Sequence, residues 1–241
     1  MLTYILVLAV GAVAGLVSGV VGTGATVILL PVLVYAFGPR EAVPIMAVVA
    51  LMSNFAKITS WWSQIDWRAT AAYAAGGIPA AALGARTLLV LPENVVEVAL
   101  GLFFLAMIPG RRWLAARDLR LGLWQVAIAG AVIGFLTGIV VSTGPLSVPV
   151  FAAYGLVKGA FIATEAAGSL ALYISKAITF RSFGALPTDI VLKGLIAGSA
   201  TMAGTYAARF IVQRLSVATF QYMLEVIMFI SGLSLLWQAM H

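Results

Sequence analysis

The sequence predicts an all-α, polytopic membrane protein made of two inverted repeats, each with an interrupted, re-entrant helical segment and about three membrane-crossing helices. Its 241 residues are 63% hydrophobic and only 9% charged, far from the composition of a water-soluble domain. Long apolar segments follow one another through short connections, and the second half of the chain repeats the glycine pattern of the first. The segments lack the alternation of transmembrane strands, so we expect helices.

The apolar segments are long enough to span a membrane, because a helical span needs about 20 residues. The uninterrupted segments lie at 39–63, 67–90, 93–109, 158–180, 187–211 and 216–239. Two longer segments, 2–37 and 121–156, are interrupted by small polar residues. An unbroken helix of either length would be about 50 Å long, at about 1.5 Å per residue, and would exceed a hydrocarbon core of about 30 Å. Each must therefore tilt steeply, bend or break.

Several classes of function are excluded by residue counts. The sequence contains no cysteine and a single histidine, His241, at its C-terminal end. Disulfides, thiolate metal sites and thiol nucleophiles are excluded, and no His-Glu-x-x-His cluster is present. We expect no metal, no cofactor and no enzymatic activity. The formal net charge of +6 is interpreted as basic cytoplasmic loops and not as a nucleic-acid-binding surface.

The two halves of the chain share a pattern of glycines. The first-half glycines Gly11, Gly15 and Gly19 recur 119 positions later as Gly130, Gly134 and Gly138. After one inserted residue, Thr23-Gly24 corresponds to Thr143-Gly144. We interpret this as a duplication, although glycine-rich membrane helices also resemble one another by chance. The predicted organisation is a first membrane repeat (1–110), a basic linker (111–120) and a second membrane repeat (121–241).

The distribution of basic residues indicates how the repeats are oriented. The linker carries Arg111, Arg112, Arg117 and Arg120, which places it in the cytoplasm by the positive-inside rule. If each interrupted segment returns to its own side, the basic residues outside the cell membrane are Arg40, Arg86, Arg181 and Lys193. A larger number of basic residues then lies in the cytoplasm. If each segment crosses once, Arg181 and Lys193 move inside and the bias is smaller. The charges favour the re-entrant, inverted arrangement, with both termini in the periplasm, and leave the single crossing open.

The interruptions are candidate binding sites. Gly22, Thr23 and Gly24 break the first long segment, and Ser142, Thr143 and Gly144 break the second. New helices are expected near Ala25 and Pro145, since threonine and serine are good N-caps and proline is well tolerated in the first turn. Helix N-termini bind anions, and broken backbone inside a membrane must be buried in protein or line an aqueous cavity. The alternative is a pair of structural kinks that pack small residues.

Two lysines lie inside predicted spans, where charges are costly and commonly functional. Lys57 and Lys176 are also separated by 119 positions, and each is displaced from the centre of its span. In an inverted fold the displacements point to opposite faces, so each lysine would guard one mouth of a central anion site. Snorkelling to the interface is the alternative. Asn54 shares the face of Lys57 and is the strongest neutral candidate. Further hydrogen-bond donors on these helices are Ser53, Ser169, Tyr173 and Ser175.

The predicted substrate-binding residues are therefore Gly22, Thr23, Gly24, Asn54, Lys57, Ser142, Thr143, Gly144 and Lys176. Two acids within spans, Glu225 and Glu165, are candidates for carrying a coupling proton. Glu225 lies deeper in its span and is the better candidate, whereas Glu165 is equally placed to pair with Lys158.

The glycine motif that begins at Gly15 and runs through Gly24 to Pro31, the stretch NFAKI and the second-half stretch GFLTGIVVSTGPLSVPVF resemble the TauE/SafE family of sulfite and organosulfur exporters. The resemblance implies a permease of the bacterial inner membrane that moves a small sulfur-containing anion such as sulfite, sulfoacetate or thiosulfate, coupled to protons. Its partners are the anion, the lipid bilayer and protons, and a homodimer stays open. A channel with a static pore is the alternative function, and an intramembrane enzyme is a remote one.

Overall fold

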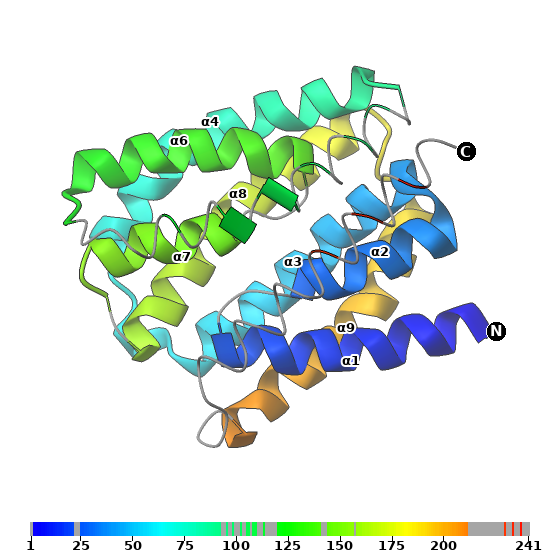
Figure 1. The fold of residues 1–241 in the computed structure, drawn as a ribbon, viewed down its shortest axis with the longest axis horizontal. Coiled ribbons are helices and arrows are strands. Elements are labelled where there is room, and N and C mark those ends of the chain that lie inside the picture. Colours follow the sequence, from blue (N-terminus) through cyan, green and yellow to red (C-terminus); the bar gives the residue numbers. More distant parts are fainter. Residues whose placement is uncertain are drawn as a thin grey trace.

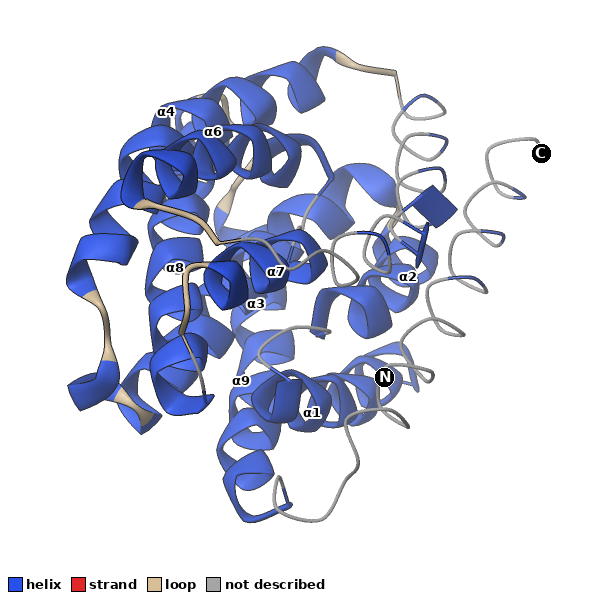
Figure 2. Cartoon of the chain, turned by 60° about the vertical axis from the view of Figure 1, so that its left-hand side comes forward, coloured by secondary structure: helices blue, strands red, loops and turns tan. Residues whose placement is uncertain are grey.

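The computed structural model describes residues 2–21, 25–92, 120–140, 144–156 and 158–211, together with single positions between 95 and 113 and between 229 and 237. In this part of the chain the fold is all-helical and contains no strand, as the sequence predicts (Figure 2). The helices are α1 (Leu2–Val21), α2 (Ala25–Phe37), α3 (Pro39–Ser60), α4 (Trp67–Val90), α6 (Leu123–Val140), α7 (Gly144–Ala153), α8 (Lys158–Ser182) and α9 (Thr188–Ile211), with a short 3-10 helix η1 (Trp62–Gln64).

The predicted spans agree closely with these helices. Segment 39–63 is α3 followed by η1, and segment 67–90 is α4. By length and composition, α3 and α4 are the two described helices that could cross a membrane, while stretches of α1, α2 and α6 are apolar but shorter. The predicted spans at 93–109 and 216–239 lie outside the described residues, apart from single positions.

Local sequence signals explain where the helices begin. Gly38 has a φ of 80°, a conformation that favours glycine, and Pro39 then occupies the first position of α3. At the start of α4, the Asp66 carboxylate accepts hydrogen bonds from the backbone N–H groups of Arg68 and Ala69 at 2.9 and 3.0 Å. These contacts satisfy two of the free donors of the first turn. The helix boundaries are thus fixed by a turn glycine, a proline and a side-chain cap.

Both interrupted segments are pairs of helices in the structure. α2 begins at Ala25, as predicted, and Pro145 is the second residue of α7. In each pair, the start of the first helix lies close to the end of the second. The rings of Tyr4, near the start of α1, and Phe37, at the end of α2, are 5.9 Å apart. The backbone N–H of Leu121, just before α6, donates to the carbonyl of Ala153, the last residue of α7, at 3.0 Å.

The bundle has two ends, which we name the Arg40 end and the Trp61 end. One pocket at the Arg40 end is lined by the start of α3, the end of α4 and the α8–α9 connection. At the Trp61 end, Gly159 near the start of α8 lies against Trp61 and Gln64. The backbone N–H of Asp66 donates to the Thr164 hydroxyl at 2.9 Å. Helices α3 and α8 therefore pack side by side in opposite directions.

Four cations gather at the Arg40 end. The Arg86 guanidinium lies 5.7 Å from the centre of the Phe183 ring, and Arg181 donates to the carbonyl of Leu186 at 3.0 Å. Lys193 forms an ion pair with Glu41 at 2.6 Å. Glu41 directly follows Arg40, the fourth cation, in the chain. Arg68, in the first turn of α4, lies at the opposite end of the bundle.

Glycines bring two pairs of helices into very close contact. α1 packs along α9, and α6 packs along α4 (Figure 1). A Cβ atom built at Gly15 would clash with the backbone of Thr201, and one built at Gly134 would clash with the backbone of Gly77. These are small-residue contacts of the kind that let helix backbones approach in membranes. We call the α1–α9 and α4–α6 contacts the two glycine seams.

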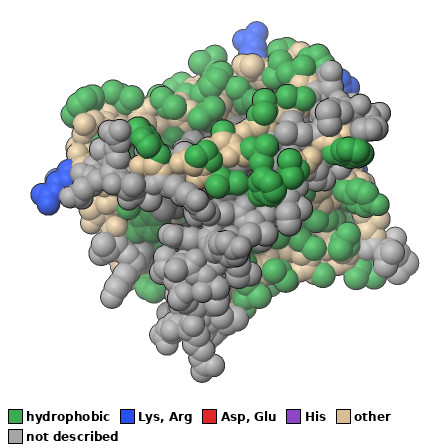
Figure 3. Space-filling view, viewed as in Figure 1, with side chains coloured by type: hydrophobic (Ala, Val, Ile, Leu, Met, Phe, Trp, Pro, Cys, Tyr) green, Lys and Arg blue, Asp and Glu red, His purple; other side chains and the backbone are tan. Residues whose placement is uncertain are grey.

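The outer surface is strongly apolar. On the face shown in Figure 3, hydrophobic side chains are spread across the described surface, and Lys and Arg side chains lie only at the periphery. Large apolar side chains that are exposed include Tyr35, Leu83, Val90, Val132 and Ile178. A helix that is apolar on its outer face as well as its inner face fits a lipid environment better than water.

Candidate functional site

Lys176 lies beside the last turn of α6, the helix that precedes the second interruption in the chain. Its side chain is 0% exposed, and its Nζ donates to the backbone carbonyl of Thr137 at 2.6 Å. Thr137 belongs to the last turn of α6, which ends at Val140. The carbonyls of a last helical turn have no partner within the helix and carry partial negative charge, so an ammonium group is stabilised there. The structure thus holds a buried cation immediately before residues 141–143.

An aromatic ring covers the other side of this cation. The Nζ of Lys176 lies 5.3 Å from the centre of the Phe180 ring, a cation–π distance. Phe180 is itself fully buried. The ammonium therefore stays inside the protein between a carbonyl and a ring, which contradicts the snorkelling alternative for Lys176.

Lys57 and Asn54 form the pair that their spacing predicts. Lys57 is 5% exposed, and its Nζ donates to Oδ1 of Asn54 at 3.4 Å. The pair is one turn along α3 from Ser53, which shares a neighbour with the last turn of α1. The Ser53 and Thr205 hydroxyls are 3.5 Å apart, and Thr205 also packs against Gly19 of α1. Lys57, one turn beyond Ser53, is near the level at which α1 ends.

The two lysines are displaced in opposite directions along the bundle. Lys57 lies in the last turns of α3, toward the Trp61 end. Lys176 lies in the last turns of α8, toward the Arg40 end. Since α3 and α8 are antiparallel, the two lysines lie toward opposite ends of the bundle, as their displacement within the predicted spans indicates.

A second polar cluster surrounds Glu165 on α8. Glu165 is 2% exposed, and its Oε1 accepts hydrogen bonds from the hydroxyls of Ser147 and Ser169, both at 2.8 Å. Within the described residues, its Oε2 has no hydrogen-bond partner, and neither has the hydroxyl of buried Tyr73. Ser147 is in the first turn of α7, so this carboxylate is tied to the helix that starts after the second interruption.

The Glu165 cluster and Lys57 belong to one electrostatic system. Glu165 interacts electrostatically with Lys57 on α3 and with Tyr73 on α4. Their neighbours in the chain, Ile58 and Ala166, belong to one hydrophobic cluster between α3 and α8. A buried acid and a buried base thus lie on two helices that pack against each other.

The remaining predicted residues have different outcomes. Gly144 is the first residue of α7, but Gly22, Thr23, Gly24, Ser142, Thr143 and Glu225 lie outside the described residues. The side chain of Lys158, the alternative partner of Glu165, does as well. Tyr173 is buried, whereas the Ser175 hydroxyl donates to the carbonyl of Ile78 at 2.8 Å and serves the packing of α8 on α4.

Sequence reasoning did not single out Thr137, Ser147, Tyr73 or Phe180. Thr137 contributes a backbone carbonyl, which leaves no signature in the sequence. Ser147 stands inside an apolar run and Tyr73 inside an alanine-rich helix, where both pass for packing residues. A polar side chain in the first turn after a broken helix is the signal that would have found Ser147.

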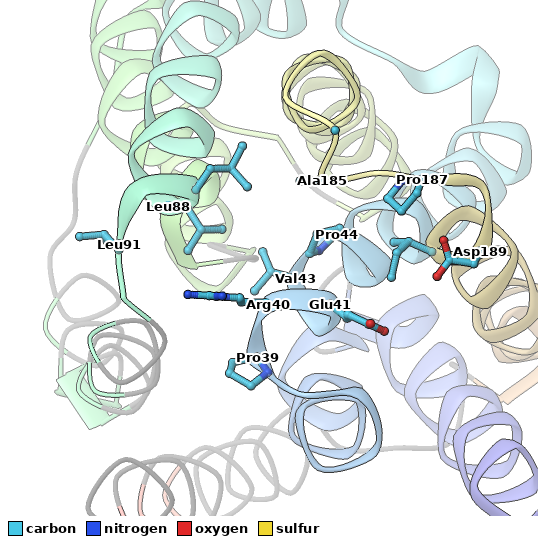
Figure 4. A pocket seen from close by; sticks show the side chains of 13 residues that line it. Pro39, Arg40, Glu41, Val43, Pro44, Leu88, Leu91, Ala185, Pro187 and Asp189 are labelled. Carbon is cyan, nitrogen blue, oxygen red and sulfur yellow. The ribbon is translucent and has the colours of Figure 1, made fainter.

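A separate pocket of about 290 Å³ lies at the Arg40 end. In Figure 4, the Arg40 and Glu41 side chains extend in opposite directions, and Glu41 points toward the side where Asp189 lies. Leu88 and Leu91 of the end of α4 form an apolar wall. Among the described residues that are predicted to bind substrate, none lines this pocket.

Comparison with known proteins adds one finding. The family model described as sulfite exporter TauE/SafE matches residues 7–235, which is nearly the whole chain. Searches of curated proteins and of solved structures gave no significant match.

Proposed function

The chain belongs to the sulfite exporter TauE/SafE family, and from this premise we propose that it is a secondary transporter that exports a small sulfur-containing anion, such as sulfite or an organosulfonate. A transport protein of the membrane also fits the apolar surface of the bundle. The observation that carries the proposal is the buried ammonium of Lys176, held at the end of α6 beside the second interruption.

The anion binds between the two interruptions. Each is followed by a helix, α2 or α7, and the first backbone N–H groups of a helix have no partner within the helix and can bind an anion. Lys57 with Asn54 serves the first interruption, and Lys176 serves the second. The proposed ligand set is the one predicted from the sequence: Gly22, Thr23, Gly24, Asn54, Lys57, Ser142, Thr143, Gly144 and Lys176.

The proposed architecture is a pair of inverted repeats, 1–110 and 121–241, joined by the basic linker. The antiparallel packing of α3 and α8 supports inversion. The two glycine seams support it as well, since α1 lies on α9 as α6 lies on α4. Re-entrance of both interrupted segments is supported by the contacts of Tyr4 with Phe37 and of Leu121 with Ala153.

The proposed orientation places the protein in the bacterial inner membrane with the Arg-rich linker in the cytoplasm. The Arg40 end then faces the periplasm and the Trp61 end the cytoplasm. The grouping of Arg86, Arg181 and Lys193 at one end, with Arg68 at the other, supports the re-entrant charge count. The single-crossing count would put Arg68 and Lys193 on the same side.

The mechanism we propose is alternating access. The anion enters from the cytoplasm, is held by the cation nearer that end, Lys57, and leaves past Lys176 toward the Arg40 end. Inverted repeats with broken helices rock one set of helices against the other around such a site. Coupling to protons is assigned to an acid inside the bundle, with Glu165 and Glu225 as candidates.

The test is counterflow of labelled sulfite in liposomes that contain the purified protein. A carrier gives uptake that saturates and is accelerated by unlabelled sulfite on the opposite side. Ohmic sulfite currents in a planar bilayer would instead identify a channel with a static pore. Competition by sulfate, thiosulfate, taurine and sulfoacetate then ranks the substrates.

A further inference from the structure

We propose that Glu165 is the internal counter-ion of Lys57 in the empty carrier, and that its carboxylate takes up a proton when the substrate anion binds at Lys57. The inference rests on the proposed function, because it needs an anion site at Lys57. It assigns Glu165 as the group that couples transport to protons. The negative charge of the substrate anion replaces the negative charge of the carboxylate beside Lys57.

The geometry leaves one oxygen of Glu165 available for the proton. Hydroxyls of Ser147 and Ser169 both donate to Oε1, at 2.8 Å each. Oε2 is buried and has no hydrogen-bond partner in the described part of the chain. A buried carboxylate oxygen without a donor is costly. Adding a proton to Oε2 relieves that cost and leaves both bonds to Oε1 in place.

The need for a proton arises when an anion reaches Lys57. Glu165 and Lys57 interact electrostatically while both are charged. A substrate anion beside Lys57 adds a second negative charge to a region shielded from water, where repulsion between like charges is strong. Two acids that share one site do not both stay ionised. The carboxyl group gives up its charge by taking a proton from the aqueous phase to which the site is open.

Few other groups in the described part of the chain act on Glu165. α3 contributes Lys57, which donates to Asn54, and α4 contributes Tyr73. Asp66, the N-cap of α4, lies beside α8, because its backbone N–H donates to the Thr164 hydroxyl. The Asp66 carboxylate is occupied by backbone donors of its own helix. α7 contributes Ser147, whose hydroxyl donates to the carboxylate. On α8 itself the polar neighbour is Ser169. Lys57 is therefore the cation that faces this acid from another helix.

Proton binding to Glu165 also affects α7, the helix that follows the second interruption. A protonated Oε2 becomes a donor, and the Tyr73 hydroxyl, buried and without a partner among the described residues, is the nearby group able to accept. Oε1 meanwhile holds Ser147 in the first turn of α7. The charge of Glu165 thus biases the position of α7, the helix that begins at the second half of the anion site. One proton therefore moves together with the anion, and the net charge that crosses the membrane is one unit less negative than the charge of the anion.

The experiment is isothermal titration calorimetry of the full chain in detergent micelles, with sulfite as the probe. Titration in two buffers of different ionisation enthalpy gives the number of protons taken up on binding. Glu165→Gln and wild type are compared at the same pH, so the protonation of sulfite itself cancels in the difference. Glu41→Gln is the matched control, because it removes one carboxylate that is ion-paired with Lys193 at the end of the bundle.

We expect wild type and Glu165→Gln to differ by up to about one proton per bound sulfite, and Glu41→Gln to match wild type. Sulfite binding with equal proton uptake in wild type and Glu165→Gln overturns this inference and leaves the transport proposal standing. No sulfite binding by wild type overturns sulfite transport and the inference with it.

A measurement on wild type alone covers the case in which Glu165→Gln fails to fold. Infrared difference spectra of protein carrying carbon-13-labelled glutamate report the C=O band of a protonated carboxyl. Addition of sulfite should raise that band, and the rise should persist in Glu41→Gln. A spectrum without a new protonated-glutamate band contradicts proton uptake by Glu165.

Discussion

The Nζ of Lys176 donates to the carbonyl of Thr137 at 2.6 Å, which joins the last turns of α8 to the last turn of α6. A lysine held in this way is a fixed cation and not a flexible surface charge. An incoming anion meets a positive group whose position is already determined, so little entropy is lost on binding.

Replacing the buried lysines should weaken anion binding. We expect Lys176→Met and Lys57→Met each to lower sulfite affinity at least about tenfold, because a hydrogen bond to a charged group is worth about 1.5–3 kcal/mol. Lys193→Met is the control, since Lys193 forms an ion pair with Glu41 at the Arg40 end. Equilibrium binding of sulfite, with thermal unfolding to verify folding, checks this. Wild-type affinity in both buried-lysine variants would remove the lysines from the site.

The glycine seams should tolerate no side chain. Gly134→Ala and Gly15→Ala place a methyl group against the backbone of Gly77 and Thr201, respectively. We expect each to destabilise the protein by about 1–3 kcal/mol, the usual cost of overpacking. Gly122→Ala is the control, since a Cβ there meets only ordinary contacts, the nearest 3.7 Å from a Gln125 side-chain atom. Thermal unfolding in detergent measures the difference, and equal stability of all three variants would contradict close backbone contact.

The cap of α4 should contribute measurably to stability. Asp66→Ala removes the acceptor of the Arg68 and Ala69 backbone N–H groups. We expect a loss of about 0.5–2 kcal/mol, the typical value for an N-cap. Asp66→Asn keeps an acceptor oxygen and should lose much less. If Ala and Asn have the same effect on the unfolding temperature, the carboxylate does not act as a cap.

The orientation can be tested with single cysteines, because the chain has none of its own. Ser182 lies at the Arg40 end and Ser63 at the Trp61 end, and both are exposed. A membrane-impermeant maleimide added to spheroplasts should label Ser182→Cys, and should label Ser63→Cys only after the membrane is permeabilised. The reverse pattern would invert the assigned orientation, and labelling of both from outside would contradict the placement of the two ends on opposite sides.

The fold could be predicted from the sequence to the extent that it follows local rules. Hydrophobic length predicts the segments 39–63 and 67–90, and the structure shows them as α3 with η1 and as α4. Gly38, Pro39 and Asp66, which set the starts of these two helices, are local signals that the sequence analysis did not use. The Lys57–Asn54 pair was also predictable, since residues three apart share a helix face.

The contacts between helices were less accessible to sequence reasoning. The bond from Lys176 to a main-chain carbonyl and the link from Ser147 to Glu165 join residues 39 and 18 positions apart. Neither follows from periodicity, because both depend on how α6 and α7 lie against α8. The sequence analysis ranked Glu225 above Glu165 by depth in the span. Depth does not report which acid has a neighbouring base.

The glycine seams divide the molecule differently from the order of the chain. Helix α1 of the first half packs closely against α9 of the second half, and α6 of the second half packs closely against α4 of the first half. We call the α1–α9 pair and the α4–α6 pair the two lobes, and each lobe therefore contains one helix from each half of the chain. Neither half carries a complete lobe, so the duplicated segments depend on one another for their own packing. A rigid-body movement of one lobe relative to the other does not separate the two repeats. It moves one helix of each half together with its partner from the other half.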